Sequence, residues 1–303
     1  DAAPADTVSR AHAINHNGYL LLEAPTGAGK TLMAGHIVER FSYVEDVVWF
    51  WFAPFKGVVD QTAGYLREQF AGLRLRELHD DRAAEVSRRG DVFVTTWQTV
   101  ATRVKDKRNV RKDGELNPSV DELTTRLRKE GFRLGVVVDE AHHGFHGDTQ
   151  AAKFFHEVLD PEYTILITAT PDDVDIKAFE ERLGIADLHR TRISRQDATA
   201  AGLIKDGIKC VAYFADAEKK ALVDFEGTAL ADGIRLHREL KKALSAASLA
   251  LTPLMLVQVD SRGDSVERVK ARLLTAGFTE RQVAVHTADE PDRDLLALAN
   301  DEE

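Results

Sequence analysis

Ala24-Pro25-Thr26-Gly27-Ala28-Gly29-Lys30-Thr31 is the stretch that decides the fold of this 303-residue chain. It follows the apolar run Tyr19-Leu20-Leu21-Leu22, which is typical of a buried strand, and precedes residues 32–38, which are typical of the start of a helix. A strand, a glycine-bearing loop ending in Lys-Thr, and a helix form the layout of a phosphate-binding P-loop. Glycines let successive backbone N–H groups surround an anion, and the helix N-terminus adds the positive end of its dipole. Ala24 stands where the usual pattern has its first glycine. The predicted phosphate-binding residues are Pro25, Thr26, Gly27, Ala28, Gly29, Lys30 and Thr31.

A second element lies further along the chain, where the β-branched run 136–138 ends in Asp139-Glu140-Ala141-His142. Such a run is typical of a central parallel strand. In a P-loop nucleotide hydrolase, an acidic pair at the end of that strand completes the site. We expect Lys30 to reach the terminal phosphates and Thr31 to hold Mg²⁺. Asp139 would hold the same ion, and Glu140 would orient or deprotonate the attacking water.

A third predicted strand, 164–167, ends in Thr168-Ala169-Thr170-Pro171. Small hydroxyl side chains at this position can lie beside the acidic pair without filling the site. Together, the three elements in this order resemble motifs I, II and III of the superfamily 2 helicases and translocases, the DEAD/DEAH-like group.

Other segments extend the resemblance over nearly the whole chain. Residues 52–54 are similar to motif Ia, residues 95–98 to motif Ib, and the expected strand 254–259 to motif IV. The resemblance implies contacts to the nucleic-acid backbone, and coupling between the ATP site and the nucleic-acid site. The residues implied in these roles are Pro54, Thr96, Gln98 and Gln258 for the backbone, Thr168 and Thr170 for relay, and His142 for coupling hydrolysis to domain movement.

The Asp139–His143 sequence and the segment Ile193–Ala198 are similar to the helicase subunits of type III restriction enzymes and related bacterial phage-defence helicases. The resemblance therefore implies an ATP-dependent and Mg²⁺-dependent helicase or translocase, with DNA favoured over RNA, and a role as motor of a restriction or phage-defence system with further subunits. One alternative remains open, namely an ATP-switched module that binds nucleic acid or protein without unwinding. No nuclease pattern is evident in the sequence.

Strands alternating with helices predict an α/β fold with a parallel sheet covered by helices on both faces. With the resemblance, we expect two RecA-like P-loop NTPase domains, namely a first over 1–206 with an insertion at about 103–131, and an incomplete second over 207–303. The predicted strands are 20–23, 47–52, 74–78, 91–95, 134–138, 164–168 and 208–214. The predicted helices are 31–41, 58–70, 81–89, 121–130, 150–158, 176–183, a helical run over 216–248, and 264–276.

Composition sets further limits. The single Cys210 excludes an internal disulfide and fits the reducing cytoplasm, and no apolar run approaches the length of a membrane span. The formal net charge of −10 is unusual for a nucleic-acid binder, but binding depends on local potential. The basic stretch 103–112 is a candidate for phosphate contact. Trp97 could stack on a base, although a tryptophan directly after a strand is more often packed, and Trp49–Trp51 are expected in the core.

Two features of the family are missing from the sequence. No glutamine precedes the P-loop to read adenine, and no motifs V and VI, which would supply an arginine finger, follow residue 285. We therefore expect the 303 residues to be part of a longer protein.

Overall fold

The computed structural model describes residues 18–79, 81–101, 110, 118–142, 150–169, 173–184, 188–205, 224–259 and 264–285. The chain divides into two compact units, Asp1–Ile208 and Lys209–Glu303. The predicted strand 208–214 and most of the basic stretch 103–112 lie outside the described residues.

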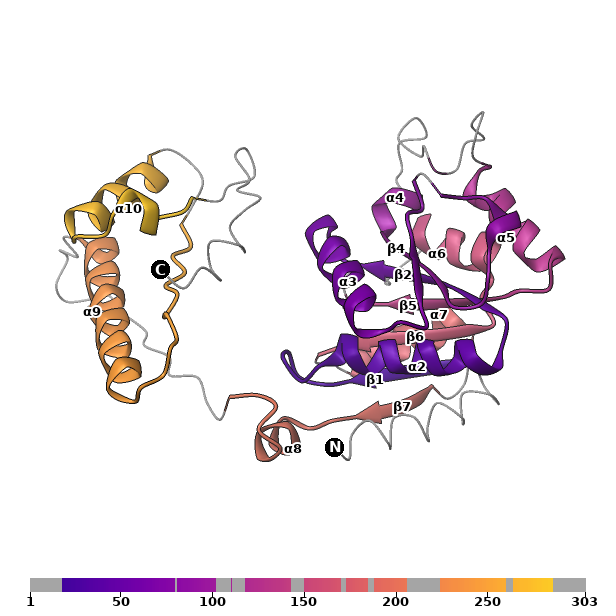
Figure 1. The fold of residues 1–303 in the computed structure, drawn as a ribbon, viewed down its shortest axis with the longest axis horizontal. Helices are drawn as coiled ribbons and strands as arrows, with labels where there is room; N and C mark the ends of the chain where they lie inside the picture. Colours follow the sequence, from indigo (N-terminus) through magenta and orange to yellow (C-terminus); the bar gives the residue numbers. More distant parts are fainter. Residues whose placement is uncertain are drawn as a thin grey trace. The chain divides into compact units, whose positions relative to one another are not determined.

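The first unit is built on a seven-stranded sheet in the order β3-β4-β2-β5-β6-β1-β7, in which every neighbouring pair is parallel (Figure 1). The strands are β1 (Tyr19–Glu23), β2 (Val47–Ala53), β3 (Arg74–Arg76), β4 (Asp91–Thr96), β5 (Arg133–Val138), β6 (Tyr163–Thr168) and β7 (His189–Arg192). The predicted α/β class and parallel sheet are thus confirmed. Because the sheet is parallel, the carboxyl ends of all its strands meet at one edge.

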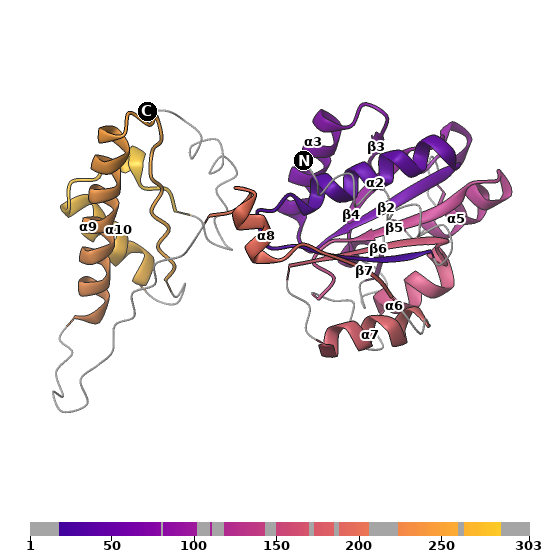
Figure 2. The same cartoon turned by 90° about the horizontal axis from the view of Figure 1, so that it is seen from below.

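Helices cover both faces of this sheet, as Figure 2 shows for α2 and α3 on one side and α6 and α7 on the other. The first face carries α2 (Lys30–Val44) and α3 (Lys56–Gln69). The second face carries α4 (Trp97–Ala101), α5 (Val120–Lys129), α6 (Gln150–Phe154) with a π-helical turn at Phe155–Leu159, and α7 (Asp173–Leu183). The helix expected at the end of the insertion is α5, and it packs within the main core.

Strand β2 shows why the two layers form. Its side chains alternate, so that Trp49 and Trp51 pack under α2 and α3 while Phe50 and Phe52 pack under the opposite helices. All four side chains are fully buried, which confirms the expected place of Trp49, Phe50 and Trp51 in the core. A strand that is apolar on both faces belongs in the centre of a parallel sheet.

Two parts of the first unit differ from the prediction. Strand β7 and the short helix α8 (Arg195–Ala200) were not expected as elements. The predicted helix 81–89 is wrong, because only the short 3₁₀ turn Ala84–Val86 forms there. The guanidinium of Arg76 donates to the carbonyl oxygens of Asp81 and Ala83, which occupies acceptors that a regular helix over these residues would use.

The second unit contains helices α9 (Phe225–Ala246) and α10 (Ser265–Thr275) and a 3₁₀ turn at Glu280–Gln282. Both helices lie where the sequence predicted helical runs. The prediction of a motif IV strand over 254–259 was wrong, because residues 251–259 form no strand. No described strand of this unit pairs with them. Leu254 and Leu256 are accordingly 77% and 88% exposed. The RecA-like character of this unit stays a prediction. Nowhere in the described ranges is a helix long and apolar enough to cross a membrane.

Candidate active site

Three loops meet at the carboxyl edge of the sheet because β1, β6 and β5 are neighbours. The P-loop follows β1, Thr168 ends β6, and the turn Asp139–His142 follows β5. Glu23 is in register with Thr168, and Val138 is in register with Leu166. The topology alone therefore brings together three motifs that are far apart in the sequence.

The P-loop has the backbone that an anion site needs. Gly27 and Gly29 have φ values of 87° and 82°, a region that favours glycine, and Gly29 begins α2 without a side-chain cap. The N–H of Ala28 donates to the carbonyl oxygen of Pro25 at 3.1 Å, and the buried methyl group of Ala28 anchors the loop in the core. Thr26, Gly27 and Gly29 are exposed. An exposed loop at the start of a long, uncapped helix fits the phosphates of a nucleotide.

The acidic turn is clamped between two strands. The N–H of Asp139 donates to the carbonyl oxygen of Phe52 on β2, and the N–H of Ala141 donates to that of Ile167 on β6, each at 2.9 Å. Between these bonds Glu140 has φ 48°, an unfavourable value for a residue with a side chain, and its N–H donates to Oδ1 of Asp139 at 3.0 Å. Strained backbone of this kind is concentrated at functional sites.

Burial raises the pKa of Asp139 to about 6, with a further contribution from the neighbouring charge of Glu140. The hydrogen bond from the Glu140 N–H and the charge of Lys30 oppose this rise. A carboxylate in this position lacks sufficient positive charge around it, and a divalent cation would supply that charge. The Asp139 carboxylate and the Thr31 hydroxyl are hard oxygen donors and fit Mg²⁺.

Among the described residues, no group of three or more histidine, cysteine or acidic side chains is arranged so that it could hold a metal ion. This does not conflict with a magnesium site, since Mg²⁺ is commonly held by one or two carboxylates and by the phosphates of the substrate.

Lys30 connects the P-loop to the acidic turn. Its Nζ lies 3.7 Å from Oε1 of Glu140, and the two side chains are 9% and 28% exposed. The lysine is therefore held at the site while its charge remains available to a ligand.

His142 connects the acidic turn to β6. Its Nδ1 lies 3.0 Å from Oγ1 of Thr168 and 3.5 Å from Oε2 of Glu140. Thr168 is fully buried and the His142 side chain is 29% exposed, so this contact is partly buried. The structure brings together the predicted residues Lys30, Asp139, Glu140, His142 and Thr168, while Thr170 lies outside the described residues.

The residues expected to contact nucleic acid are placed less uniformly. Pro54 and Gln98 follow the adjacent strands β2 and β4, and Gln98 is exposed. Thr96 is only 8% exposed, and its hydroxyl lies 3.1 Å from that of Thr99, so it faces inward. Gln258 is exposed in the second unit.

Glu23, immediately before the P-loop, is a residue that sequence reasoning missed. This carboxylate is 4% exposed and accepts a hydrogen bond from Nε of Arg190 on β7 at 2.8 Å. Its carbonyl oxygen accepts the N–H of Ile193 at 2.8 Å, which leads the chain into α8, and Ala198 of α8 packs in the same core cluster as Ala28. The sequence signal for this buried carboxylate was a glutamate directly after the apolar run Tyr19–Leu22.

A protein-family model, described as the res subunit of type III restriction enzymes, matches residues 5–173. A search of curated proteins found no match. The helicase domain of Hef from Pyrococcus furiosus is similar in structure, with 19% identity, a TM-score of 0.40, and coverage of 93% of this chain and 52% of that one.

Two further solved structures are also similar. The SWI2/SNF2 ATPase core of Sulfolobus solfataricus, in complex with dsDNA, has 15% identity, a TM-score of 0.44, and coverage of 92% of this chain and 60% of that one. A nuclease-deletion mutant of the Type ISP restriction-modification enzyme LlaGI, in complex with a DNA substrate mimic, has 15% identity, a TM-score of 0.38, and coverage of 97% and 30%. The chain spans only 30% to 60% of these three proteins.

The family model covers more than half of the chain and includes the P-loop and the acidic turn. The predicted resemblance is thereby confirmed, and the chain belongs to the family of type III restriction enzyme res subunits, with the superfamily 2 helicase-like ATPase fold.

Proposed function

We propose that this protein hydrolyses ATP with Mg²⁺ and uses the energy to move along nucleic acid. The observation that carries the proposal is the convergence of Lys30, Glu140 and Asp139 at the carboxyl edge of the sheet. Membership in the res subunit family supports it, because the acidic turn and the P-loop both lie within the matched residues.

In this proposal, residues Pro25–Thr31 bind the phosphates through exposed backbone N–H groups at the start of α2. Lys30 contributes a point charge, and Thr31 and Asp139 hold the metal. Mg²⁺, when bound, neutralises phosphate charge and fixes the phosphate oxygens. Phosphate would draw Lys30 away from Glu140, since a multiply charged anion is the stronger partner for an ammonium group.

Glu140 is the proposed general base. Released from Lys30, its carboxylate would accept a proton from the attacking water or hold that water in line. The turn that presents it is fixed on both sides by backbone hydrogen bonds. The carboxylate therefore has little freedom to leave the site, which is what general-base catalysis requires.

His142 and Thr168 are the proposed relay, with Thr170 as a further member. His142 contacts both the proposed general base Glu140 and Thr168 at the end of β6. A change in the position of either partner would therefore alter the contact of His142 with the other. Pro54, Thr96, Gln98 and Gln258 are the proposed backbone contacts, which would make recognition largely independent of sequence. DNA is the favoured substrate because the family is named for restriction enzymes, and we propose a motor role beside other subunits of such a system.

The test is steady-state ATP hydrolysis with single-stranded DNA, duplex DNA, RNA and no nucleic acid, with Lys30→Ala beside the wild type. Stimulation by one nucleic acid that is lost in Lys30→Ala is the expected result. Turnover that no nucleic acid changes would overturn the motor proposal. Magnesium-dependent ATP binding without turnover would instead favour the ATP-switched module.

A further inference from the structure

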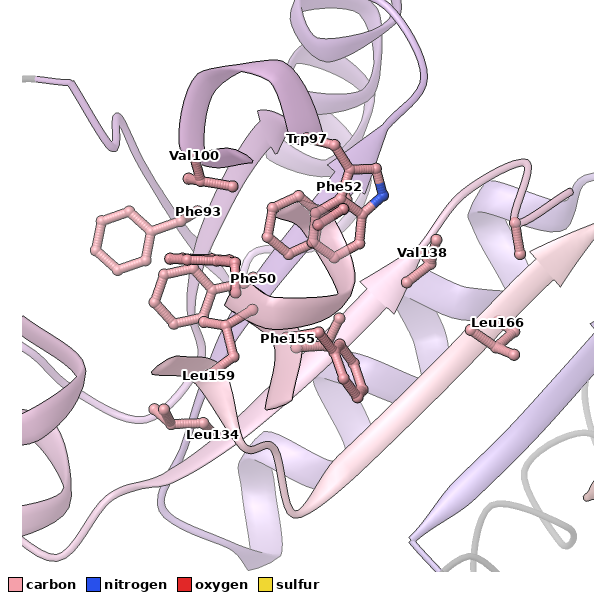
Figure 3. Packing of buried hydrophobic residues seen from close by; sticks show 14 of the residues in the cluster. Phe50, Phe52, Phe93, Trp97, Val100, Leu134, Val138, Phe155, Leu159 and Leu166 are labelled. Atoms are coloured by element: carbon pink, nitrogen blue, oxygen red, sulfur yellow. The ribbon is translucent and has the colours of Figure 1, made fainter. Parts of the chain in front are cut away.

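The stacked pair Phe52 and Trp97 packs in the same core cluster as Val138, which ends β5, and Ala141 of the acidic turn. Their ring centroids are 3.7 Å apart and their planes differ by 2°. In the neighbouring stack of Phe50 on β2 and Phe93 on β4, the corresponding values are 5.2 Å and 20°. Phe52 is fully buried and Trp97 is 8% exposed. Figure 3 shows the two rings against each other, with Val138 of β5 nearby.

Phe52 connects this stack to the site. Its carbonyl oxygen accepts the N–H of Asp139 at 2.9 Å, which extends the β2–β5 ladder by one bond beyond the end of β5. The direction in which the Asp139 carboxylate leaves the backbone thus depends on the position of Phe52. The position of the Phe52 side chain depends in turn on Trp97, whose indole covers one face of the ring.

Trp97 is also placed between two residues of the predicted nucleic-acid segment. Thr96 ends β4, and Trp97 and Gln98 begin α4. A rigid ring in contact with β2 therefore joins this segment to the backbone of the acidic turn.

From these contacts we propose that Trp97 is a positioning residue for Asp139 and acts through Phe52. The proposal rests on the proposed function, because it assumes that Asp139 holds the magnesium of Mg·ATP. A tryptophan that only filled the core would stabilise the fold but would not alter the magnesium requirement. Loss of a residue that supports a metal ligand typically weakens metal binding by about 10-fold to 100-fold.

The test measures the anisotropy of a fluorescent ATP analogue while Mg²⁺ is titrated, so that no turnover is needed. The variants are Trp97→Leu, Phe52→Leu and the conservative Trp97→Phe. Phe93→Leu is the matched control, since it removes a ring from the neighbouring Phe50–Phe93 stack between β2 and β4, whereas the backbone hydrogen bond to Asp139 is made by Phe52. Thermal unfolding of each variant records the structural cost.

We expect Trp97→Leu and Phe52→Leu to need about 10-fold more Mg²⁺ for half-maximal binding. Trp97→Phe should need nearly the same Mg²⁺ concentration as the wild type. Phe93→Leu should lose thermal stability without a change in the Mg²⁺ concentration for half-maximal binding. An unchanged requirement in Trp97→Leu, or an equal shift in Phe93→Leu, would overturn the inference. Failure of the wild type to bind the analogue at any Mg²⁺ concentration would contradict the proposed function itself.

Discussion

Nζ of Lys30 lies 3.7 Å from Oε1 of Glu140, although the two residues come from loops separated in the sheet by strand β6. One residue begins the helix after β1 and the other follows β5. Their contact shows that the two motifs lie together in the fold, and it places the candidate phosphate-binding cation beside the candidate base.

Replacing Lys30 with alanine should abolish Mg·ATP binding while leaving the fold intact. The ion pair with Glu140 is long and partly exposed, and such pairs contribute about 0–1 kcal/mol to stability. Nucleotide binding and thermal unfolding measured together check this. Lys129→Ala, an exposed lysine at the end of α5, is the control and should bind nucleotide normally. A large loss of thermal stability in Lys30→Ala would show that the lysine is structural.

Replacing Glu140 with glutamine should separate binding from turnover. The amide keeps the size of the side chain but cannot accept a proton, so turnover should fall by about 10²-fold or more. Mg·ATP affinity should be retained, because the P-loop and Asp139 are unchanged. Single-turnover hydrolysis with equilibrium binding measures both quantities. Wild-type turnover in this variant would remove Glu140 from the mechanism.

The stability of the nucleotide-free protein should show the raised pKa of Asp139. A carboxyl group with a pKa of about 6 when folded and 3.8 when unfolded stabilises the fold below about pH 4, and this contribution is lost as pH rises through about 6. The loss amounts to about 3 kcal/mol at most. Asp139→Asn has no ionisable group at this position and lacks the pH-dependent contribution, so its free energy of unfolding relative to that of the wild type should increase between pH 4 and pH 7.

Chemical denaturation without Mg²⁺ or nucleotide at several pH values measures that difference. Comparing the two proteins cancels groups that respond in the opposite direction, such as Asp81, whose pKa is lowered by its hydrogen bond from Arg76. A difference that stays constant across the range would contradict the assigned burial of Asp139.

Replacing Thr168 with valine should uncouple nucleic acid from hydrolysis. Valine keeps the shape of this buried side chain but removes the hydroxyl next to Nδ1 of His142. Stimulation of turnover by nucleic acid should fall, while Mg·ATP binding should persist. Thr164→Val on the same strand is the matched control, since the buried hydroxyl of Thr164 has no hydrogen-bond partner among the described residues. Equal effects in both variants would contradict a role for the His142 contact.

Replacing Gly135 with alanine should destabilise the sheet by about 1–3 kcal/mol through overpacking. A Cβ atom there would lie 2.3 Å from the ring of Trp49, which is fully buried on the paired strand. Urea unfolding measures this cost. Gly64→Ala within α3, where a Cβ meets nothing within 4 Å, should be neutral or stabilising. Unchanged stability in Gly135→Ala would mean that Trp49 has room to move.

The sequence predicted those parts of the fold whose signal is local. Six strands lie within a few residues of their predicted bounds because apolar runs such as Val47–Phe52 are strong and bounded by polar residues. Strand β7, His189–Arg192, escaped prediction because it is short, polar and at the sheet edge, where only one neighbour holds it. The helix predicted over 81–89 was wrong because a local pattern does not show that Arg76 donates to the carbonyl oxygens of Asp81 and Ala83.

The site shows the same division. The motifs predicted Lys30 at the start of the helix after one strand and Asp139 and Glu140 directly after another, and the parallel topology brings these segments together. Contacts between residues that are distant in the sequence and adjacent only in the fold had no signal in the sequence. The Arg190 partner of Glu23 and the Phe52 carbonyl that holds Asp139 are set by strand order, which no single segment of sequence encodes.

The most direct test of the central claim is phosphate release from Mg·ATP, measured with and without saturating nucleic acid in the wild type and in Glu140→Gln. The account predicts that one nucleic acid accelerates release in the wild type and that Glu140→Gln binds nucleotide but releases almost no phosphate under either condition. Release from the wild type at the same rate with every nucleic acid, or acceleration that survives in Glu140→Gln, would contradict it.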